Sequence, residues 1–219
     1  MDRTALRAAL ESERLALADV VDTLGAEEWR APSLCTGWTV QDVVAHMTLT
    51  SRLTKLGAIR AVLAARGDIN RMIDEAARAR AAEYSPAELA AQLRETAGSE
   101  RRPLGTQPRD PLVDVLVHAQ DITRPLGLPH AMPAEHVVPA LEQVWGSSFY
   151  GPQKRLAGLR LVATDADWSA GDGDREVRGP AGELLLVATG RPAGLAALEG
   201  PGVEDAAARL RARTPRRRS

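Results

Sequence analysis

The side chains with the clearest chemical potential are a carboxylate and an imidazole four residues apart, Asp114 and His118. At about 100° per residue, such a pair lies on one face of a helix, one turn apart. Both groups can then direct a donor atom at the same point and bind a single metal ion. A solvated helix face with an ordinary ion pair has the same spacing, so the pair by itself leaves both interpretations open.

A second imidazole, His46, lies on another predicted helix, one position before Met47 and three after Val43. A single histidine at the margin of an apolar face is more often a core or boundary residue than a ligand. Helical bundles, however, build metal sites from inward-facing histidines and carboxylates on facing helices. Together, His46, Asp114 and His118 would supply three protein ligands and leave one coordination position open, as catalytic zinc sites do.

The other reactive side chains are interpreted as structural. Cys35, the only cysteine, has no basic residue close in sequence, and a buried inert thiol is the favoured interpretation. Arg78 and Arg80 could clamp a substrate carboxylate, but a solvated Ala/Arg helix face is favoured for both. His130 and His136 lie in or beside a proline-containing loop and are expected at the surface.

Apolar periodicity predicts the helices that would position these groups. Thr39, with Asp42 three residues later, is typical of a helix N-terminus, and the pattern that follows can continue to about residue 66. Asp110 and Pro111 open a helix that is expected to end near residue 124. Further helices are expected over residues 4–24, 70–82, 86–98 and 133–148, with an irregular connector over 26–38.

The character of the chain changes after residue 155. Residues 158–164 alternate as a strand does, residues 175–178 can form a return strand, and helical segments are expected near 180–188 and 203–213. The predicted class is therefore α+β. The predicted parts are an all-α bundle over residues 1–150, a small α+β domain over residues 155–213 and a disordered basic tail over residues 214–219.

Composition excludes several classes of function. The chain has 219 residues, 44% of them hydrophobic, and a net charge of −1, which supplies no strong field to attract nucleic acid or an anionic membrane. The first seven residues are charged where a signal peptide needs an apolar core, and no apolar run approaches the roughly 18 residues of a membrane helix. One cysteine excludes an internal disulfide. We therefore expect a cytoplasmic protein that binds neither nucleic acid nor membranes.

Three stretches of the sequence carry a family resemblance. They are WRAPSLCTGWTVQDVVAH at 29–46, DVLVHAQDI at 114–122, and LVATDADW at 161–168 with RGP at 178–180 and TGRP at 189–192. In this order they resemble the approach to the second helix, the second metal motif and the C-terminal domain of the mycothiol-dependent maleylpyruvate isomerase family. That family belongs to the DinB-like metal-binding four-helix bundles, and its C-terminal domain is sterol-carrier-like.

The resemblance implies a divalent metal ion, usually zinc, held by His46, Asp114 and His118. The family more often carries Glu where this chain has Asp114, so the shorter side chain brings the ion closer to its helix or binds it less tightly. The resemblance also implies mycothiol, the low-molecular-weight thiol of actinobacteria, as a thiol cofactor. A thiol that coordinates a metal is deprotonated at neutral pH, and the thiolate is the nucleophile.

We therefore predict a divalent-metal-dependent, mycothiol-using enzyme, an isomerase or a thiol transferase, that acts on a small electrophilic substrate. In the isomerase, thiol addition to a conjugated cis double bond is followed by rotation and elimination to the trans product, whereas related proteins stop after S-transfer. The alternatives are a non-catalytic metal-binding or small-ligand-binding module of the same fold, and a metal-free member that acts through protein contacts. A monomer or homodimer is expected.

Overall fold

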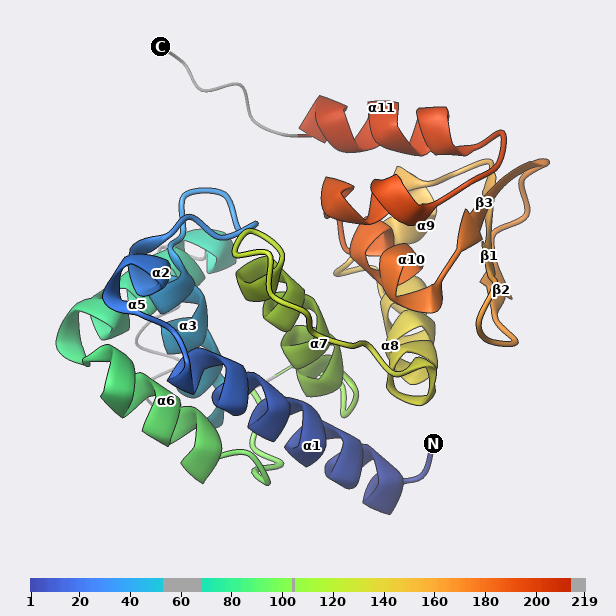
Figure 1. The fold of residues 1–219 in the computed structure, drawn as a ribbon. Helices are drawn as coiled ribbons and strands as arrows, with labels where there is room; N and C mark the ends of the chain where they lie inside the picture. Colours follow the sequence, from blue (N-terminus) through green and yellow to red (C-terminus); the bar gives the residue numbers. More distant parts are fainter. Residues whose placement is uncertain (53–67, 104, 214–219) are drawn as a thin grey trace, which may run out of the picture. The chain divides into compact units, whose positions relative to one another are not determined.

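The computed structural model describes residues 1–52, 68–103 and 105–213 (Figure 1). The chain divides into two compact units, Met1–His130 and Ala131–Ser219. The predicted tail over 214–219, and the part of the predicted Thr39 helix beyond residue 52, lie outside the described residues. Over the described part of the chain, no helix combines the length and the apolarity that crossing a membrane requires.

The first unit is a helical bundle. Its helices are α1 (Arg3–Asp22), α2 (Ala26–Arg30), α3 (Val40–Arg52), α5 (Ile69–Glu83), α6 (Pro86–Glu95) and α7 (Asp110–Thr123). Both α1 and α3 pack against α6 and α7, so these four helices surround a shared core, while α5 packs on α3. Figure 1 shows α1 and α6 side by side. The predicted apolar stripes supply that core, including the fully buried Leu17, Val43, Val44, Leu89 and Leu116.

The start of α3 is fixed by the residues that predicted it. The backbone N–H and the hydroxyl of Thr39 both donate to Asp42 Oδ2 at 2.8 Å, and the Asp42 N–H donates to Thr39 Oγ1 at 3.2 Å. This reciprocal arrangement satisfies backbone donors that the first turn of a helix leaves unpaired. The rotation of α3, and with it the direction in which His46 points, follows from the burial of Val43, Val44 and Met47 on its inward face.

The segment expected to be an irregular connector contains one short helix, α2, which buries Trp29. Beyond α2 the chain turns sharply, and the Trp38 N–H donates to the Cys35 carbonyl at 2.9 Å. Gly37 makes this turn possible because its φ of 82° is a conformation that other residues adopt only under strain. The turn places Cys35 and Trp38 beside the helices that carry the predicted metal ligands.

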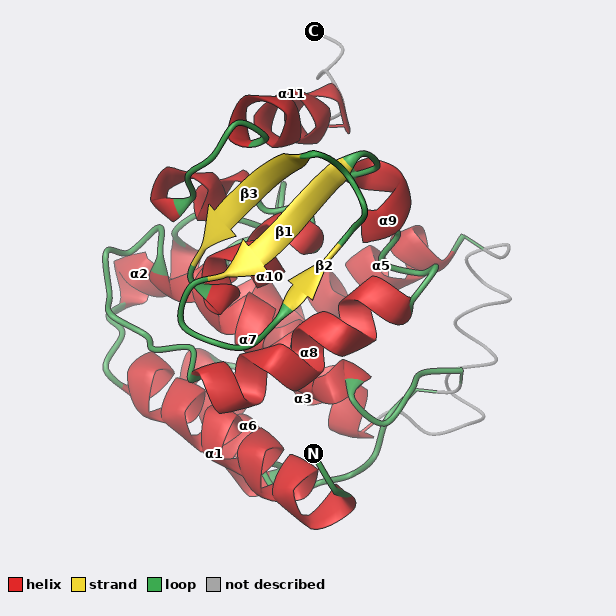
Figure 2. Ribbon diagram, turned by 90° about the vertical axis from the view of Figure 1, so that its right-hand side faces the viewer, coloured by secondary structure: helices red, strands yellow, loops and turns green. Residues whose placement is uncertain are grey.

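The second unit is a small α+β fold. It contains α8 (Ala134–Gly146), α9 (Pro152–Arg155), β1 (Leu159–Ala163), β2 (Ser169–Ala170), β3 (Arg175–Gly179), α10 (Ala181–Ala188), the 3₁₀ helix η1 (Pro192–Ala197) and α11 (Val203–Arg213). The strand order is β2-β1-β3, as Figure 2 shows, and α10 packs on β1 and β3. The α+β class predicted from the sequence, with an N-terminal helical bundle and a small C-terminal α+β unit, is confirmed.

One strand direction and one boundary differ from the prediction. The strand expected as a return strand, β3, pairs parallel to β1, because the chain reverses at β2 and crosses over before β3 begins. The units divide at His130, earlier than the predicted boundary between residues 150 and 155. The physical reason is that α8 packs against α10, so it belongs to the second unit rather than to the bundle.

Candidate metal centre

Two helices bring the three predicted ligands together. α3 supplies His46, and α7 supplies Asp114 and His118 one turn apart. Asp114 Oδ1 lies 3.6 Å from His46 Nε2 and 3.4 Å from His118 Nε2, and one donor atom from each of the three residues lies within 4.8 Å of the others. The side chains of the histidines are 12% exposed and that of Asp114 is 29% exposed, so solvent reaches the cluster from one side.

These distances fit a shared metal ion better than direct hydrogen bonds. Nitrogen and oxygen ligands at about 2.0–2.2 Å from a tetrahedral zinc ion stand about 3.4 Å from each other. A good N–H···O hydrogen bond spans only about 2.7–3.2 Å. The two nitrogen–oxygen separations of 3.4 and 3.6 Å therefore match the edge of a coordination tetrahedron, and the donor set of two imidazoles and one carboxylate suits a divalent ion.

Even without a metal ion, the surroundings of Asp114 and His118 favour the charged forms of both side chains. Burial would raise the pKa of Asp114, but the interactions of its carboxylate with His118 and then with His46 outweigh burial and lower that pKa well below its usual range. Burial would likewise lower the pKa of His118, yet Asp114 first, and then Asp121 and Cys35, raise it well above its ordinary value. The metal-free site thus favours the doubly protonated form of His118, and a metal ion that bound at Nε2 would displace the proton on that nitrogen.

Aromatic contacts position the His46 ring. Its centroid lies 5.4 Å from the Trp38 ring and 5.1 Å from the His118 ring. Trp38 is itself tied to α5, because its indole N–H donates to Asp74 Oδ1 at 2.6 Å. The Arg78 guanidinium donates to the same carboxylate and to the Gly37 carbonyl, at 3.0 and 2.7 Å. Helix α5 therefore supports α3, the helix that carries His46, through the connector.

The two arginines considered as substrate clamps have structural partners. Arg78 is exposed and holds the connector as described above. Arg80 is half-buried: its Nε donates to Thr48 Oγ1 at 2.8 Å, and its guanidinium lies 4.5 Å from the centre of the Tyr84 ring. Both side chains thus stabilise contacts of α5. The solvated face favoured from the sequence agrees with the exposed Arg78, whereas Arg80 is half-buried.

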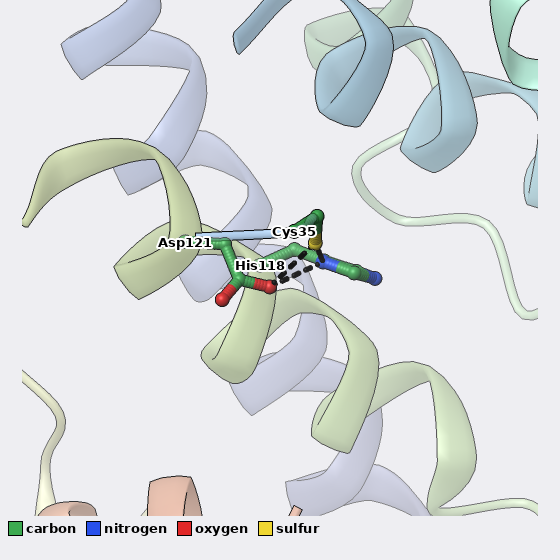
Figure 3. A group of neighbouring side chains, drawn as sticks. All are labelled: Cys35, His118 and Asp121. Atoms are coloured by element: carbon green, nitrogen blue, oxygen red, sulfur yellow. Dashed lines mark hydrogen bonds and ion pairs between the residues drawn. The ribbon is translucent and has the colours of Figure 1, made fainter. Parts of the chain in front are cut away.

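Two further residues adjoin the cluster. Asp121 Oδ2 lies 2.9 Å from His118 Nδ1, and the Cys35 thiol lies 3.1 Å from the same carboxylate oxygen and 3.7 Å from the same ring nitrogen (Figure 3). Asp121 stands three residues after His118 on α7, and this spacing places it on the same stripe of the helix as Asp114 and His118. No sequence signal places Cys35 there. The expectation of an inert packed thiol is incomplete, because Cys35 is half-buried against two polar side chains.

The surface position predicted for His130 is wrong. Its side chain is only 5% exposed and lies 3.9 Å from the equally buried Glu13 carboxylate. Burial lowers the pKa of His130, and the charge of Glu13 opposes that shift. Gln120 on α7 donates to the His130 carbonyl at 2.9 Å, which draws this loop onto the bundle and explains the burial.

The fold and the site together define a helical bundle with a two-histidine, one-carboxylate cluster, followed by a small α+β unit. Residues 10–138 match the family model of the mycothiol maleylpyruvate isomerase N-terminal domain, a range that contains all three clustered residues. The chain belongs to this family.

Comparison with solved structures supports the same fold. The structure described as the crystal structure of the mycothiol-dependent maleylpyruvate isomerase superposes with a TM-score of 0.58 and 15% sequence identity. The alignment covers 87% of this chain and 90% of that one, so the likeness includes both units. A search of curated proteins gave no match.

Proposed function

We propose that the chain is a divalent-metal-dependent enzyme that uses mycothiol to act on a small electrophilic substrate. The observation that carries the proposal is the convergence of His46 Nε2, Asp114 Oδ1 and His118 Nε2 at separations that suit one ion. Membership of the maleylpyruvate isomerase family, and the fold shared with a mycothiol-dependent maleylpyruvate isomerase, support mycothiol as the thiol.

The residues of the cluster suit such a role. When bound, a divalent ion such as Zn²⁺ supplies Lewis acidity and favours the thiolate form of a thiol that coordinates it. His46 and His118 contribute neutral nitrogen ligands and Asp114 a single negative charge, so a divalent centre keeps net positive charge for an anionic partner. Three protein ligands leave a position for that partner, and the partial exposure of all three side chains gives it access.

The test combines metal analysis with thiol titration. We expect about one equivalent of Zn²⁺ in the 219-residue chain, and its loss in His46→Ala and in His118→Ala, because each change removes one of three ligands. His136→Ala, a histidine of the second unit, is the control and should keep its metal. Mycothiol should bind the zinc-loaded protein and not the chelated one.

Three outcomes would contradict the proposal in different ways. A protein without metal would favour a member that acts through protein contacts alone. Metal with no thiol affinity, and a large loss of thermal stability on chelation, would favour a non-catalytic metal-binding module. Metal-dependent turnover that persists in His118→Ala would show that the site lies elsewhere. Among active outcomes, an unconsumed thiol with an isomerised substrate indicates an isomerase, and a thioether product indicates a transferase.

A further inference from the structure

His118 belongs to two clusters of metal-capable side chains at once. Its Nε2 faces Asp114 and His46, and its Nδ1 faces Asp121 and Cys35. Figure 3 shows the second cluster, in which the Asp121 carboxylate and the Cys35 thiol meet at the imidazole. The two clusters could hold two ions bridged by the imidazole, or one ion whose histidine ligand is supported from behind.

The separations in the second cluster decide between these possibilities. Oxygen and nitrogen ligands of one zinc ion stand about 3.4 Å apart, and sulfur and oxygen ligands about 3.6 Å apart. The observed separations from Asp121 Oδ2 are 2.9 Å to His118 Nδ1 and 3.1 Å to Cys35 Sγ. Both are too short for ligands of a common ion and suit direct hydrogen bonds. The second cluster is therefore a hydrogen-bonded support and not a second metal site.

We infer that Asp121 is a positioning residue that accepts a hydrogen bond from His118 Nδ1–H and so directs the Nε2 lone pair at the metal position. The inference rests on the proposed metal-dependent function. The Cys35 thiol donates to the same oxygen of Asp121 and holds the carboxylate in place. Metal-ligating histidines commonly donate their second N–H in this way, which fixes the tautomer and increases the basicity of the ligand.

The surroundings of Asp121 support this role. Asp121 is completely buried. Burial of a carboxylate lowers the stability of the fold unless hydrogen-bond donors surround it. Its backbone carbonyl accepts from the Leu34 N–H at 3.0 Å, so the connector that carries Cys35 is tied to the same turn of α7. His46 is held differently: among the described residues its buried Nδ1 has no hydrogen-bond partner, and the Trp38 ring packs beside it. His118 is thus the ligand whose orientation depends on a hydrogen bond.

The experiment measures metal binding in the 219-residue chain, with Zn²⁺ affinity from chelator competition and the visible spectrum of the Co²⁺-loaded protein as readouts. We expect Asp121→Ala to weaken Zn²⁺ binding by about 10–100-fold and to shift the Co²⁺ bands. Asp121→Asn keeps the shape and an acceptor oxygen but loses the charge, so it should show a smaller loss and serves if the alanine variant does not fold. Glu13→Gln removes another buried carboxylate charge of the same bundle and is the matched control, expected to bind as the wild type does.

Substitutions of Cys35 distinguish a positioning role of Asp121 from a general contribution of Asp121 to folding. Cys35→Ser keeps a donor to Asp121 Oδ2 and should restore near wild-type affinity, whereas Cys35→Ala should lose affinity in the same direction as Asp121→Ala. Wild-type affinity and an unchanged Co²⁺ spectrum in both Asp121 variants would overturn the inference and leave the proposed function intact. Two equivalents of metal in the wild type, with one lost in Asp121→Ala, would overturn it by making Asp121 a ligand. Failure of the wild type to bind either ion would instead contradict the proposed function, and the inference with it.

Discussion

His118 is the residue on which the candidate site depends most. Both of its ring nitrogens have an anionic neighbour, Asp114 on one side and Asp121 on the other, at 3.4 and 2.9 Å. A neutral imidazole carries one N–H and one lone pair, so it can satisfy one carboxylate as a donor and use the other nitrogen as a ligand. Without a metal ion, protonation satisfies both neighbours, which explains why the pKa of His118 is raised.

The raised pKa of His118 makes the stability of the metal-free protein depend on pH. The pKa of this group is above its unfolded value of 6.5, so its contribution is fully present below about pH 6.5 and is lost as pH rises through the folded-state pKa. The contribution of Asp114, whose pKa is lowered, is present above its ordinary value of 3.8 and is lost only in stronger acid. We therefore expect the melting temperature in chelator to fall on the alkaline side.

The measurement is thermal unfolding from about pH 5 to about pH 9 in chelator, for the wild type and for His118→Asn. The variant should show a flatter alkaline limb, because it removes the titrating group. With saturating Zn²⁺ in place of the chelator, the melting temperature of the wild type should no longer fall at alkaline pH, because a metal ion binds the neutral imidazole. His118→Asn should show no such effect of Zn²⁺. Parallel curves for the two proteins would show that another group causes the slope.

At the scale of elements, the sequence predicts the helices and their inward faces well. The apolar residues of α7 between Leu112 and Ile122 are buried, as the helical period predicts. This burial is predictable because the 3.6-residue period of an amphipathic helix is a local property. The local sequence does not specify which element an apolar face packs against. The α8 pattern is the same whether the helix packs on the bundle or on α10, and the alternation that predicts β3 contains no information on its direction.

The same distinction explains which parts of the site were predictable. Asp114 and His118 share one helix, so their spacing alone placed them together, and Asp121 follows by the same geometry. His46 needed the packing of α3 on α7, which the bundle hypothesis supplied. Cys35 reaches Asp121 only because the connector turns at Gly37 and the Leu34 N–H bonds to α7. The glycine indicates a turn, but the residue pattern does not say which helix the turned chain meets.

The joint between α1 and α6 depends on a buried cation. Arg14 of α1 donates through Nη1 to the carbonyls of Thr96, Ala97 and Ser99, at 3.2, 3.1 and 2.8 Å. These carbonyls follow the end of α6, where the helical hydrogen-bond pattern stops, and the Thr96 carbonyl also accepts from the Ser99 N–H at 2.9 Å. Burial lowers the pKa of Arg14, and the negative charge of Asp114 opposes this shift. The cation thus replaces missing helical donors.

We expect Arg14→Ala to lower the free energy of unfolding by about 3 kcal/mol, because it removes the guanidinium donor from the Ala97 and Ser99 carbonyls and leaves only the Ser99 N–H on the Thr96 carbonyl. Arg94→Ala is the matched control, since Arg94 joins the same two helices through Asp19 and Asp22 but is 43% exposed, where solvent and salt screen the ion pairs. Urea unfolding of the two variants should therefore show a large shift of the midpoint for Arg14 and little change for Arg94. Equal shifts would show that the exposed ion pairs hold the helices as strongly as the buried cation.

At the scale of the whole molecule, the residues of the candidate metal site all come from the first of the two units. The three candidate ligands and the groups that hold them, Trp38, Asp121 and Cys35, all belong to residues 1–130. Residues 131–219 have their own sheet, covered by α10. Metal binding is therefore expected to be a property of the first unit, even though the similar solved structure shares the fold of both.

Hydrogen exchange of the 219-residue chain, with and without saturating Zn²⁺, tests this division. A ligand that binds only the folded form stabilises it by about 2.7 kcal/mol at a hundred times its dissociation constant. Local opening of α3, α7 and the 31–38 connector would break the site, so amides there should exchange more slowly with Zn²⁺. Peptides from residues 131–219 should exchange at the same rate in both states, and His118→Ala should abolish the difference in the first unit. Slower exchange in residues 131–219 that also requires His118 would show that the second unit responds to the metal. Metal binding would then not be a property of the first unit alone.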